Sequence, residues 1–321
     1  MNQKGIAIAG NLITDIGYTI DQYPKKGNLT WMYEPKVHTG GVNNILVDLA
    51  RMDPNLPLKV SGLIGDDENG KVVLNTLKDY PNINIHNITA KGRSAVTYAM
   101  TERSSKQRTF FYDPGTTLEY DETYIDWEVL DADIFHLEYL LLLGTLDEAD
   151  DQYGTKASKV LYEAKSRGMK TSIDVVSEES VRYSQVVLPA LKYTDYCIIN
   201  EVEAEGATGI KLKNEENIFE ENMWQALEKL GELGVQEWAV IHSPQCGYGL
   251  NCKTNEKVKV KSRVLPEGYI KGTTGAGDAY CAGVLYGAYK GTSIREALEI
   301  GVHCASCSLS AEDSNSGVVQ F

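Results

Sequence analysis

The residues with the clearest chemical potential lie near the C-terminus, in the run Lys271-Gly-Thr-Thr-Gly-Ala-Gly-Asp-Ala-Tyr280. Gly275 and Gly277 permit backbone conformations that a side chain would penalise, and the residues after them predict the start of a helix. Such a loop presents unpaired N–H groups and the positive end of a helix dipole to an anion. Asp278 would lie beside a phosphate held there and could take a proton from an attacking hydroxyl. Taken alone, a Gly-x-Gly followed by Asp more often marks a tight turn and a helix start.

The same run closely resembles the C-terminal signature of the PfkB, or ribokinase-like, family of carbohydrate and nucleoside kinases. In that family the Gly-Ala-Gly amides stabilise the transferring phosphoryl group, and the final Asp is the base. The resemblance therefore implies that Asp278 is the catalytic base. It also implies an anion hole and nucleotide contacts formed by Gly275, Ala276, Gly277, Thr273 and Thr274.

The expected substrate residues lie mostly in the N-terminal part of the chain. The apolar run 6–9 between two glycines predicts a buried strand leading into a loop, and Asp15 follows it. A carboxylate just past a strand end is where an open α/β sheet places ligand contacts, although a loop Asp can also simply satisfy its own backbone. Gly40-Gly41 precede a helical pattern from Val42 to Met52, and this segment resembles the family's N-terminal signature. The resemblance implies that the substrate contacts come from Asp15, Gly40, Gly41 and Asn44.

Glu138 ends a second apolar run, Asp133 to Glu138, which predicts another buried strand. Some members of the family place a substrate-binding Glu at this point. An acid that contacts the lid or faces solvent fits the pattern equally well. Glu138 is therefore a further candidate for substrate binding.

The nucleotide and metal contacts are expected around Asn200-Glu-Val-Glu203, which resembles the family's Asn-x-x-Glu motif. Read without the family, the segment is an acidic helix start capped by Asn200. The resemblance implies that Asn200 and Glu203 organise the phosphates of ATP and a Mg²⁺ ion through water, and oxygen ligands with retained waters suit that ion. Gly272 replaces an Asp that helps hold a monovalent cation in many members, so a potassium requirement stays open. Ser243 or Gly247 would stand where relatives contact the nucleotide, but neither can be assigned that role.

Two apparent nucleotide motifs are rejected. Gly65-Asp-Asp-Glu-Asn-Gly-Lys-Val72 has the spacing of a P-loop, but Val72 lacks the hydroxyl that ligates magnesium and three acids in the loop would repel phosphate. The segment Gly5 to Gly10 lacks the Gly-x-Gly-x-x-Gly spacing of a dinucleotide-binding fold, which disfavours a dehydrogenase.

The composition limits the kinds of partner that the protein is expected to bind. A net charge of −14 over 321 residues argues against binding to nucleic acid or to an anionic membrane, because both need a basic surface. The start of the chain has too short an apolar run for a signal peptide, so we expect a cytoplasmic protein whose 6 cysteines are reduced. The pair Cys304 and Cys307 is the only Cys-x-x-Cys, and metal or redox use of it is disfavoured.

Strands that alternate with helices predict βαβ units and a parallel sheet. Together with the resemblance, this gives an α/β fold: a ribokinase-like three-layer α/β/α sandwich with a mostly parallel central sheet and a small β-sheet lid. We expect one kinase domain over residues 1–321, with lid segments at approximately 14–38 and 93–115. β-Branched and aromatic residues at 95–100 and 109–112 predict a hairpin within the second segment. In the family such a lid excludes water and often forms a homodimer.

The sequence thus predicts an ATP-dependent kinase that phosphorylates a hydroxyl, with a primary one favoured, of a small sugar or sugar-like substrate. A nucleoside kinase of the same fold, for adenosine, inosine or a pseudouridine-like substrate, remains an alternative, since Trp31 and the lid tyrosines could clamp a base. A catalytically silent nucleotide- or sugar-binding regulator is the alternative from another class.

Overall fold

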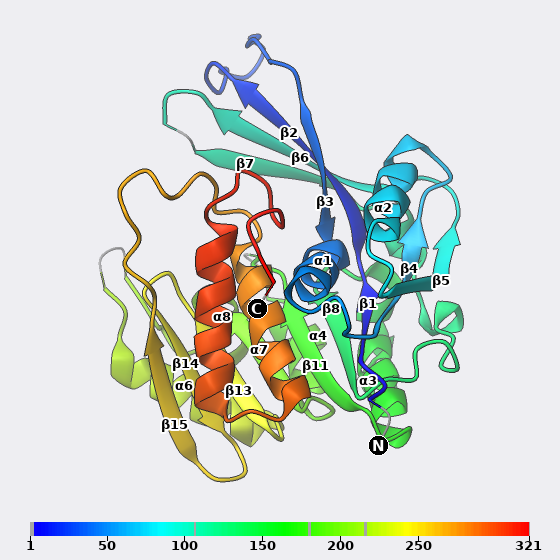
Figure 1. Cartoon of the computed structure of the whole chain (residues 1–321), viewed down its shortest axis with the longest axis vertical. Helices are drawn as coiled ribbons and strands as arrows, with labels where there is room; N and C mark the ends of the chain where they lie inside the picture. Colours follow the sequence, from blue (N-terminus) through cyan, green and yellow to red (C-terminus); the bar gives the residue numbers. More distant parts are fainter. Residues whose placement is uncertain (1–2, 106, 179–180, 215–216, 321) are drawn as a thin grey trace.

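The computed structural model describes residues 3–105, 107–178, 181–214 and 217–320. Figure 1 shows a large layered body from which a small sheet projects. Within the described ranges, no helix combines the length and the apolar character needed to cross a membrane.

A sheet of nine strands forms the centre of the body (Figure 1). Neighbouring strands run parallel from β5 to β13, and β14 and β15 continue the sheet as antiparallel strands. In spatial order the strands are β15 (Glu256–Lys261), β14 (Cys246–Asn251), β13 (Trp238–His242), β12 (Tyr196–Asn200), β11 (Lys170–Val175), β8 (Ile134–Leu140), β1 (Ile6–Gly10), β4 (Leu58–Ile64) and β5 (Ile83–Ala90). The middle strands are buried on both faces, which explains why they read as short continuous apolar runs.

Helices cover both faces of this sheet, and each layer shares its own apolar core. One core unites α1 (Val42–Met52), α2 (Glu68–Lys78), α7 (Ala276–Lys290) and α8 (Ile294–Ser308). The other core unites α3 (Lys156–Ser166), α4 (Tyr183–Leu191), α5 (Glu201–Thr208) and α6 (Glu220–Leu233). Short elements complete the body: η1 (Gly115–Glu119), η2 (Glu122–Tyr124), η3 (Gly144–Asp147), β9 (Ala149–Asp150) and β10 (Gly154–Thr155). The predicted three-layer α/β/α architecture is confirmed.

A second sheet of four strands projects above the body (Figure 1). Its strands, in spatial order, are β3 (Lys36–Gly41), β2 (Leu12–Ile20), β6 (Ala95–Glu102) and β7 (Arg108–Asp113). The predicted hairpin is confirmed as the antiparallel pair β6 and β7, whereas β2 and β6 run parallel. This sheet brings two segments together that are about eighty residues apart in the chain.

The prediction of a loop that carries Asp15 is wrong. Only Asn11 separates β1 from β2, so Asp15 lies inside β2 of the second sheet. The side chain of Asn11 donates to Leu142 O at 2.9 Å, and its backbone N–H donates to Glu138 O at 3.1 Å. These contacts hold Asn11, the single residue that connects the central sheet to the projecting one. No local sequence pattern predicts so short a connection.

Side-chain caps fix the starts of three helices. Ser293 and Glu296 form a capping box at the start of α8. Asn200 caps α5. The segment with P-loop spacing is a helix start, since the Asp67 side chain accepts from Gly70 N at 2.8 Å and caps α2.

Candidate active site

The glycine loop lies at the N-terminus of α7, under the projecting sheet (Figure 1). Gly275 is the N-cap residue with φ 79°, and a Cβ there would lie 2.4 Å from the carbonyl oxygen of Ser314. Only glycine fits this left-handed and crowded position. Among the residues that the structure describes, no acceptor is recorded for the N–H groups of Gly277 and Asp278. A 15-residue helix therefore presents free N–H groups and its positive end at this loop.

Asp278, in the first turn of α7, is held by two side chains from distant elements. Tyr139 OH donates to Asp278 Oδ1 at 2.6 Å, and Asn44 Nδ2 donates to Asp278 Oδ2 at 2.7 Å. Asn44 is fixed in turn, because its Oδ1 accepts from Ser314 Oγ at 2.8 Å. Asp278 is half-buried, so part of the residue remains accessible. We call Asp278, Asn44, Tyr139 and Ser314 the floor of the site.

The electrostatics of the floor suit a base. Burial raises the pKa of Asp278, and the hydrogen bonds from Tyr139 and Asn44 partly offset that rise. Burial and the nearby Asp278 raise the pKa of Tyr139, which therefore stays a neutral donor. Asp278 thus combines a fixed orientation with a proton affinity above that of an exposed carboxylate.

Asp15 and Gly40 meet across β2 and β3 of the second sheet. A Cβ on Gly40 would lie 2.4 Å from Asp15 Oδ2, so a larger residue at position 40 would displace this carboxylate. Gly41 has φ 63° and caps α1, which carries Asn44. Burial and the nearby Asp278 raise the pKa of Asp15 to about 6. The predicted residues Asp15, Gly40, Asn44 and Asp278 are therefore brought together.

Glu138 lies deeper than the sequence suggested. Its side chain is fully buried, with Oε2 placed 3.2 Å from His136 Nε2. His136 Nδ1 lies 3.0 Å from Ser172 Oγ on the next strand. Burial, with Asp278 and Asp174 nearby, raises the pKa of Glu138 well above its usual value. Its neighbour Tyr139, which the sequence reasoning missed, is the residue that reaches Asp278; its place at the end of a buried strand was the available signal.

Asn200 and Glu203 form a complete capping box at the start of α5. Glu203 Oε2 accepts from Asn200 N at 2.8 Å, and Oε1 accepts from Asn200 Nδ2 at 2.6 Å and Ser177 Oγ at 2.8 Å. Burial raises the pKa of Glu203 to about 7. Burial and the nearby Glu203 raise the pKa of Asp174 well above its usual value.

This donor set fits a Mg²⁺ ion held through water better than one bound directly. Both oxygens of Glu203 already accept hydrogen bonds, so direct coordination would disrupt the cap. In the described ranges, no three His, Cys, Asp or Glu side chains group closely enough to hold a metal. Burial and the nearby Glu203 nevertheless raise the pKa of Asp174, and a cation nearby would relieve that repulsion.

The residues around Gly272 do not fit the potassium arrangement of the family. A Cβ at this position would lie 2.8 Å from both Ala311 O and Glu312 O. An Asp would therefore require the chain at 311–312 to move. Position 272 supplies no carboxylate for a monovalent cation.

The two threonines before the glycine loop line a cavity of about 560 Å³ at its outer rim. Thr273 is exposed, and Thr274 Oγ1 accepts a hydrogen bond from Arg108 Nη1 of the projecting sheet. Arg108 was not predicted from the sequence. The other residues after β13 are structural: Ser243 Oγ bonds to the backbone of Cys246, and a Cβ on Gly247 would lie 2.0 Å from Tyr280 OH.

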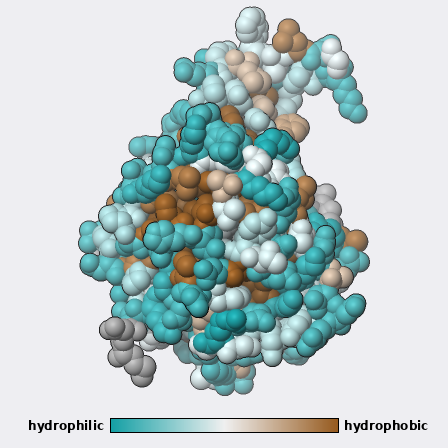
Figure 2. All heavy atoms as spheres, turned by 90° about the vertical axis from the view of Figure 1, so that its right-hand side faces the viewer, coloured by the Kyte–Doolittle hydropathy of each residue, from teal (hydrophilic) through white to brown (hydrophobic). Residues whose placement is uncertain are grey.

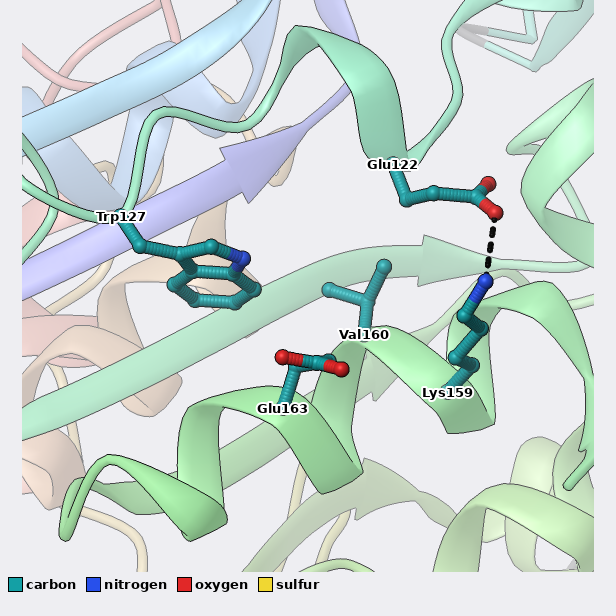
Figure 3. A pocket seen from close by; sticks show the side chains of 5 residues that line it. All are labelled: Glu122, Trp127, Lys159, Val160 and Glu163. Carbon is teal, nitrogen blue, oxygen red and sulfur yellow. Dashed lines mark hydrogen bonds and ion pairs between the residues drawn. The ribbon is translucent and has the colours of Figure 1, made fainter.

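A smaller cavity, of about 200 Å³, lies against α3 and away from the floor (Figure 3). Trp127 and Val160 form its apolar wall, and Lys159 Nζ pairs with Glu122 Oε1 at 3.0 Å on one side. None of the predicted site residues lines this cavity.

Comparison with known proteins shows the family to which this fold and site belong. A model of the pfkB family of carbohydrate kinases matches residues 6–320. An uncharacterized sugar kinase of Archaeoglobus fulgidus is 27% identical over 246 residues, which are 75% of this chain and 86% of that protein.

Solved structures show the same fold at low sequence identity. The structure of Arabidopsis thaliana ribokinase complexed with ribose and ATP matches with a TM-score of 0.79 and 19% identity, covering 99% of this chain and 96% of that one. The Methanocaldococcus jannaschii nucleoside kinase, an archaeal member of the ribokinase family, matches with a TM-score of 0.73 and 16% identity over 99% of this chain and 95% of that one.

The chain belongs to the pfkB family of carbohydrate kinases. It is an ATP-dependent kinase with a hydroxyl group as acceptor. The family prediction is confirmed.

Proposed function

We propose that the protein transfers the γ-phosphate of ATP to a hydroxyl, primary by preference, of a small sugar or sugar-like acceptor, with Asp278 as the general base. The observation that carries this proposal is the carboxylate of Asp278, fixed by Asn44 and Tyr139 at the N-terminus of α7. A base must be oriented toward the hydroxyl and must have a proton affinity suited to neutral pH. The two hydrogen bonds that hold the Asp278 carboxylate, and the rise of its pKa on burial, support this role.

In the reaction, the acceptor O–H loses its proton to Asp278 while its oxygen attacks the γ-phosphorus. The bond between that phosphorus and the bridging oxygen of ADP breaks, and ADP leaves with the electron pair. The amides of Gly275, Ala276 and Gly277 offer hydrogen bonds to the negative charge on the transferring group. Folding has already oriented the amide donors that would stabilise the charge on the transferring phosphoryl group.

The acceptor would lie between the floor and the second sheet. Asp15 would accept hydrogen bonds from its hydroxyls, while Gly40 and Gly41 would let it approach the backbone beside Asn44. Glu138, buried behind Tyr139, would act on substrate binding through that neighbour.

Asn200 and Glu203, with Thr273 and Thr274, would lie along the phosphates of ATP. A Mg²⁺ ion near Glu203 would neutralise phosphate charge when bound with the nucleotide.

We further propose one kinase domain over residues 1–321, with segments of approximately 14–38 and 93–115 as its lid. Large apolar side chains are exposed on these lid segments, including Leu29 at 86% and Trp31 at 74% between β2 and β3, and Phe110 at 57% on β7. Figure 2 shows hydrophobic colours on the projection. Exposed apolar surface of this kind supports a homodimer through the lid, which light scattering would measure. Six free thiols support a reducing, cytoplasmic location.

The decisive experiment is ATP-to-ADP turnover with magnesium against a panel of pentoses, hexoses, keto-sugar acids, phosphorylated sugars and nucleosides, with and without potassium. We expect a strong response to one class of sugar and no potassium requirement, because Gly272 supplies no carboxylate. A strong response to nucleosides alone would favour the alternative in which aromatic residues such as Trp31 and Tyr33 clamp a base. Binding of ATP without turnover on any acceptor would favour a silent regulator.

A further inference from the structure

We propose that the cavity between β7 and residues 270–274 is a subsite for a phosphate group, with Arg108 as its principal ligand and Lys271 as a second cation. The cavity has a volume of about 560 Å³ and is lined by Arg108, Phe110, Ile270, Lys271, Gly272, Thr273 and Thr274. This inference rests on the proposed kinase function and adds a binding group that the signature motifs do not contain.

Arg108 connects the projecting sheet with the loop that precedes α7. It begins β7 on the projecting sheet, and its half-buried side chain donates from Nη1 to the hydroxyl of Thr274. Thr274 directly precedes Gly275, the N-cap of α7. The guanidinium group is therefore placed next to the loop whose free N–H groups would bind phosphate.

The whole chain has a net charge of −14, and acidic side chains cluster around Asp278 on the inner side of the loop: Asp15, Glu138, Asp174 and Glu203. The N–H groups of the loop and the N-terminus of α7 would attract a phosphate, and cations at the outer rim would add to that attraction. Arg108 and Lys271 are the two basic residues that line the cavity there.

Arg108 is the more available of the two cations. In the described part of the chain, neither Arg108 nor Lys271 forms an ion pair with a carboxylate within 4 Å, whereas Lys36 pairs with Glu312 and Arg93 pairs with Asp113. Lys36 and, to a smaller extent, Lys271 lower the pKa of Glu312, so part of the Lys271 charge is already balanced. Arg108 uses one N–H group on a neutral hydroxyl and keeps the others for a phosphate, which the planar guanidinium can bind through two parallel hydrogen bonds. A neutral sugar would not require this pair of charges.

Two sources could supply the phosphate group: the terminal phosphate of ATP, or a phosphate carried by the acceptor. Calorimetric binding distinguishes them without any turnover. The affinity for ADP with magnesium is compared with that for a non-hydrolysable ATP analogue, in the wild type and in Arg108→Gln. Arg103→Gln is the matched control, because Arg103 belongs to the same hairpin but lies over the ring of Tyr33, 5.5 Å from its centroid.

If the terminal phosphate is the ligand, Arg108→Gln should reduce the preference for the analogue over ADP by roughly 10- to 100-fold, with Arg103→Gln unchanged. If the acceptor's phosphate is the ligand, the preference stays constant and turnover of phosphorylated sugars falls by at least about tenfold, while turnover of unphosphorylated ones does not. Arg108→Lys should restore part of either loss, because it keeps the charge and loses the planar geometry.

An unchanged nucleotide preference together with unchanged selectivity for phosphorylated acceptors would overturn the subsite. Thermal unfolding of each variant checks folding, and if Arg108→Gln does not fold, Lys271→Gln carries the same two comparisons. Failure of the kinase proposal would look different: Asp278 would be dispensable for turnover, whereas the binding comparison would still report on Arg108.

Discussion

The floor of the site and its outer rim differ in how firmly hydrogen bonds hold their polar side chains. On the floor, the carboxylate of Asp278 accepts from both Tyr139 and Asn44, and Asn44 is held by Ser314. At the rim, the one side-chain hydrogen bond of Arg108 within the described residues goes to the hydroxyl of Thr274, and Lys271 is exposed. The floor joins β8, α1, α7 and the C-terminal segment, whereas the rim depends on the projecting sheet.

This difference in hydrogen bonding suits two different functions, proton acceptance at the floor and binding of a charged ligand at the rim. A base works when its orientation is fixed before the substrate arrives, so its partners should be bonded in the free protein. A group that captures a charged ligand works when its charge is not already neutralised. We therefore expect changes to the floor to reduce the rate of phosphoryl transfer, and changes to the rim to alter binding.

The largest expected effect comes from Asp278→Asn. An amide cannot accept the proton of the acceptor hydroxyl, and its NH₂ group would face one of the two present donors, Tyr139 or Asn44. We expect kcat to fall by at least about 10³-fold, while calorimetry finds ATP binding largely retained. Turnover that survived the substitution would show that another group accepts the proton.

The sequence predicted those parts of the floor that lie in contiguous motifs. Asp278 and the glycines lie in a loop that opens a helix, and the resemblance to the family's N-terminal signature implied Asn44 at the start of a second helix. Tyr139 and Ser314 could not be found in this way, because their contacts join residues 139 and 270 positions apart. Such pairings are decided by tertiary packing.

The fold also has parts that local sequence patterns predicted and parts that depend on tertiary packing. Alternating apolar runs and helical patterns predicted the parallel sheet, since both faces of its strands are buried. The path of β2 was missed, because a single residue carries the chain from one sheet to the other. Arg108 was missed for a related reason: only the parallel pairing of β2 with β6 brings its hairpin over the glycine loop.

Tyr139→Phe should give the next largest effect and tests whether the floor orients and tunes the base. The hydrogen bond from Tyr139 lowers the pKa of Asp278, so its loss should move the acid limb of the kcat profile to higher pH and reduce kcat by roughly tenfold. Tyr286→Phe is the control, because Tyr286 OH bonds to Asp53 at 3.2 Å, outside the floor. An unshifted profile in Tyr139→Phe would mean that Tyr139 has only a packing role.

A smaller and reversible effect is expected from pH at Asp15. The pKa of this carboxyl is raised to about 6, so it is ionised above that pH and progressively protonated below it. A neutral acid accepts hydrogen bonds from hydroxyls less strongly, so affinity for the acceptor should fall as pH drops from about 7 to 5. Asp15→Asn should bind more weakly throughout and lose this dependence. Equal pH dependence in both proteins would place the titration elsewhere.

The smallest effect concerns Asp48, one turn beyond Asn44 on α1 and below the floor. Its side chain is fully buried, and no hydrogen-bond partner is recorded among the described residues for either oxygen. Burial and the nearby Asp278 raise its pKa well above the usual value. For a carboxyl with a raised folded-state pKa, stability is highest when the group is protonated and falls as the pH rises above the unfolded-state pKa. Asp48→Asn should therefore raise Tm by roughly 2 °C or more at pH 8 and by less at pH 5.

Asp53, at the end of the same helix, supplies the opposite control for that comparison. It accepts from Lys290 Nζ at 3.0 Å, and its pKa is lowered by its hydrogen bonds to Lys290 and Asn55 despite partial burial. Its contribution to stability is present above its unfolded-state pKa, so Asp53→Asn should lower Tm at neutral pH and have little effect in acid. If both substitutions changed Tm in the same direction at pH 8, burial without a partner would not be what distinguishes Asp48. If they diverge as expected, the acid beneath the floor lowers stability at neutral pH, whereas Asp53, with its partners, raises it.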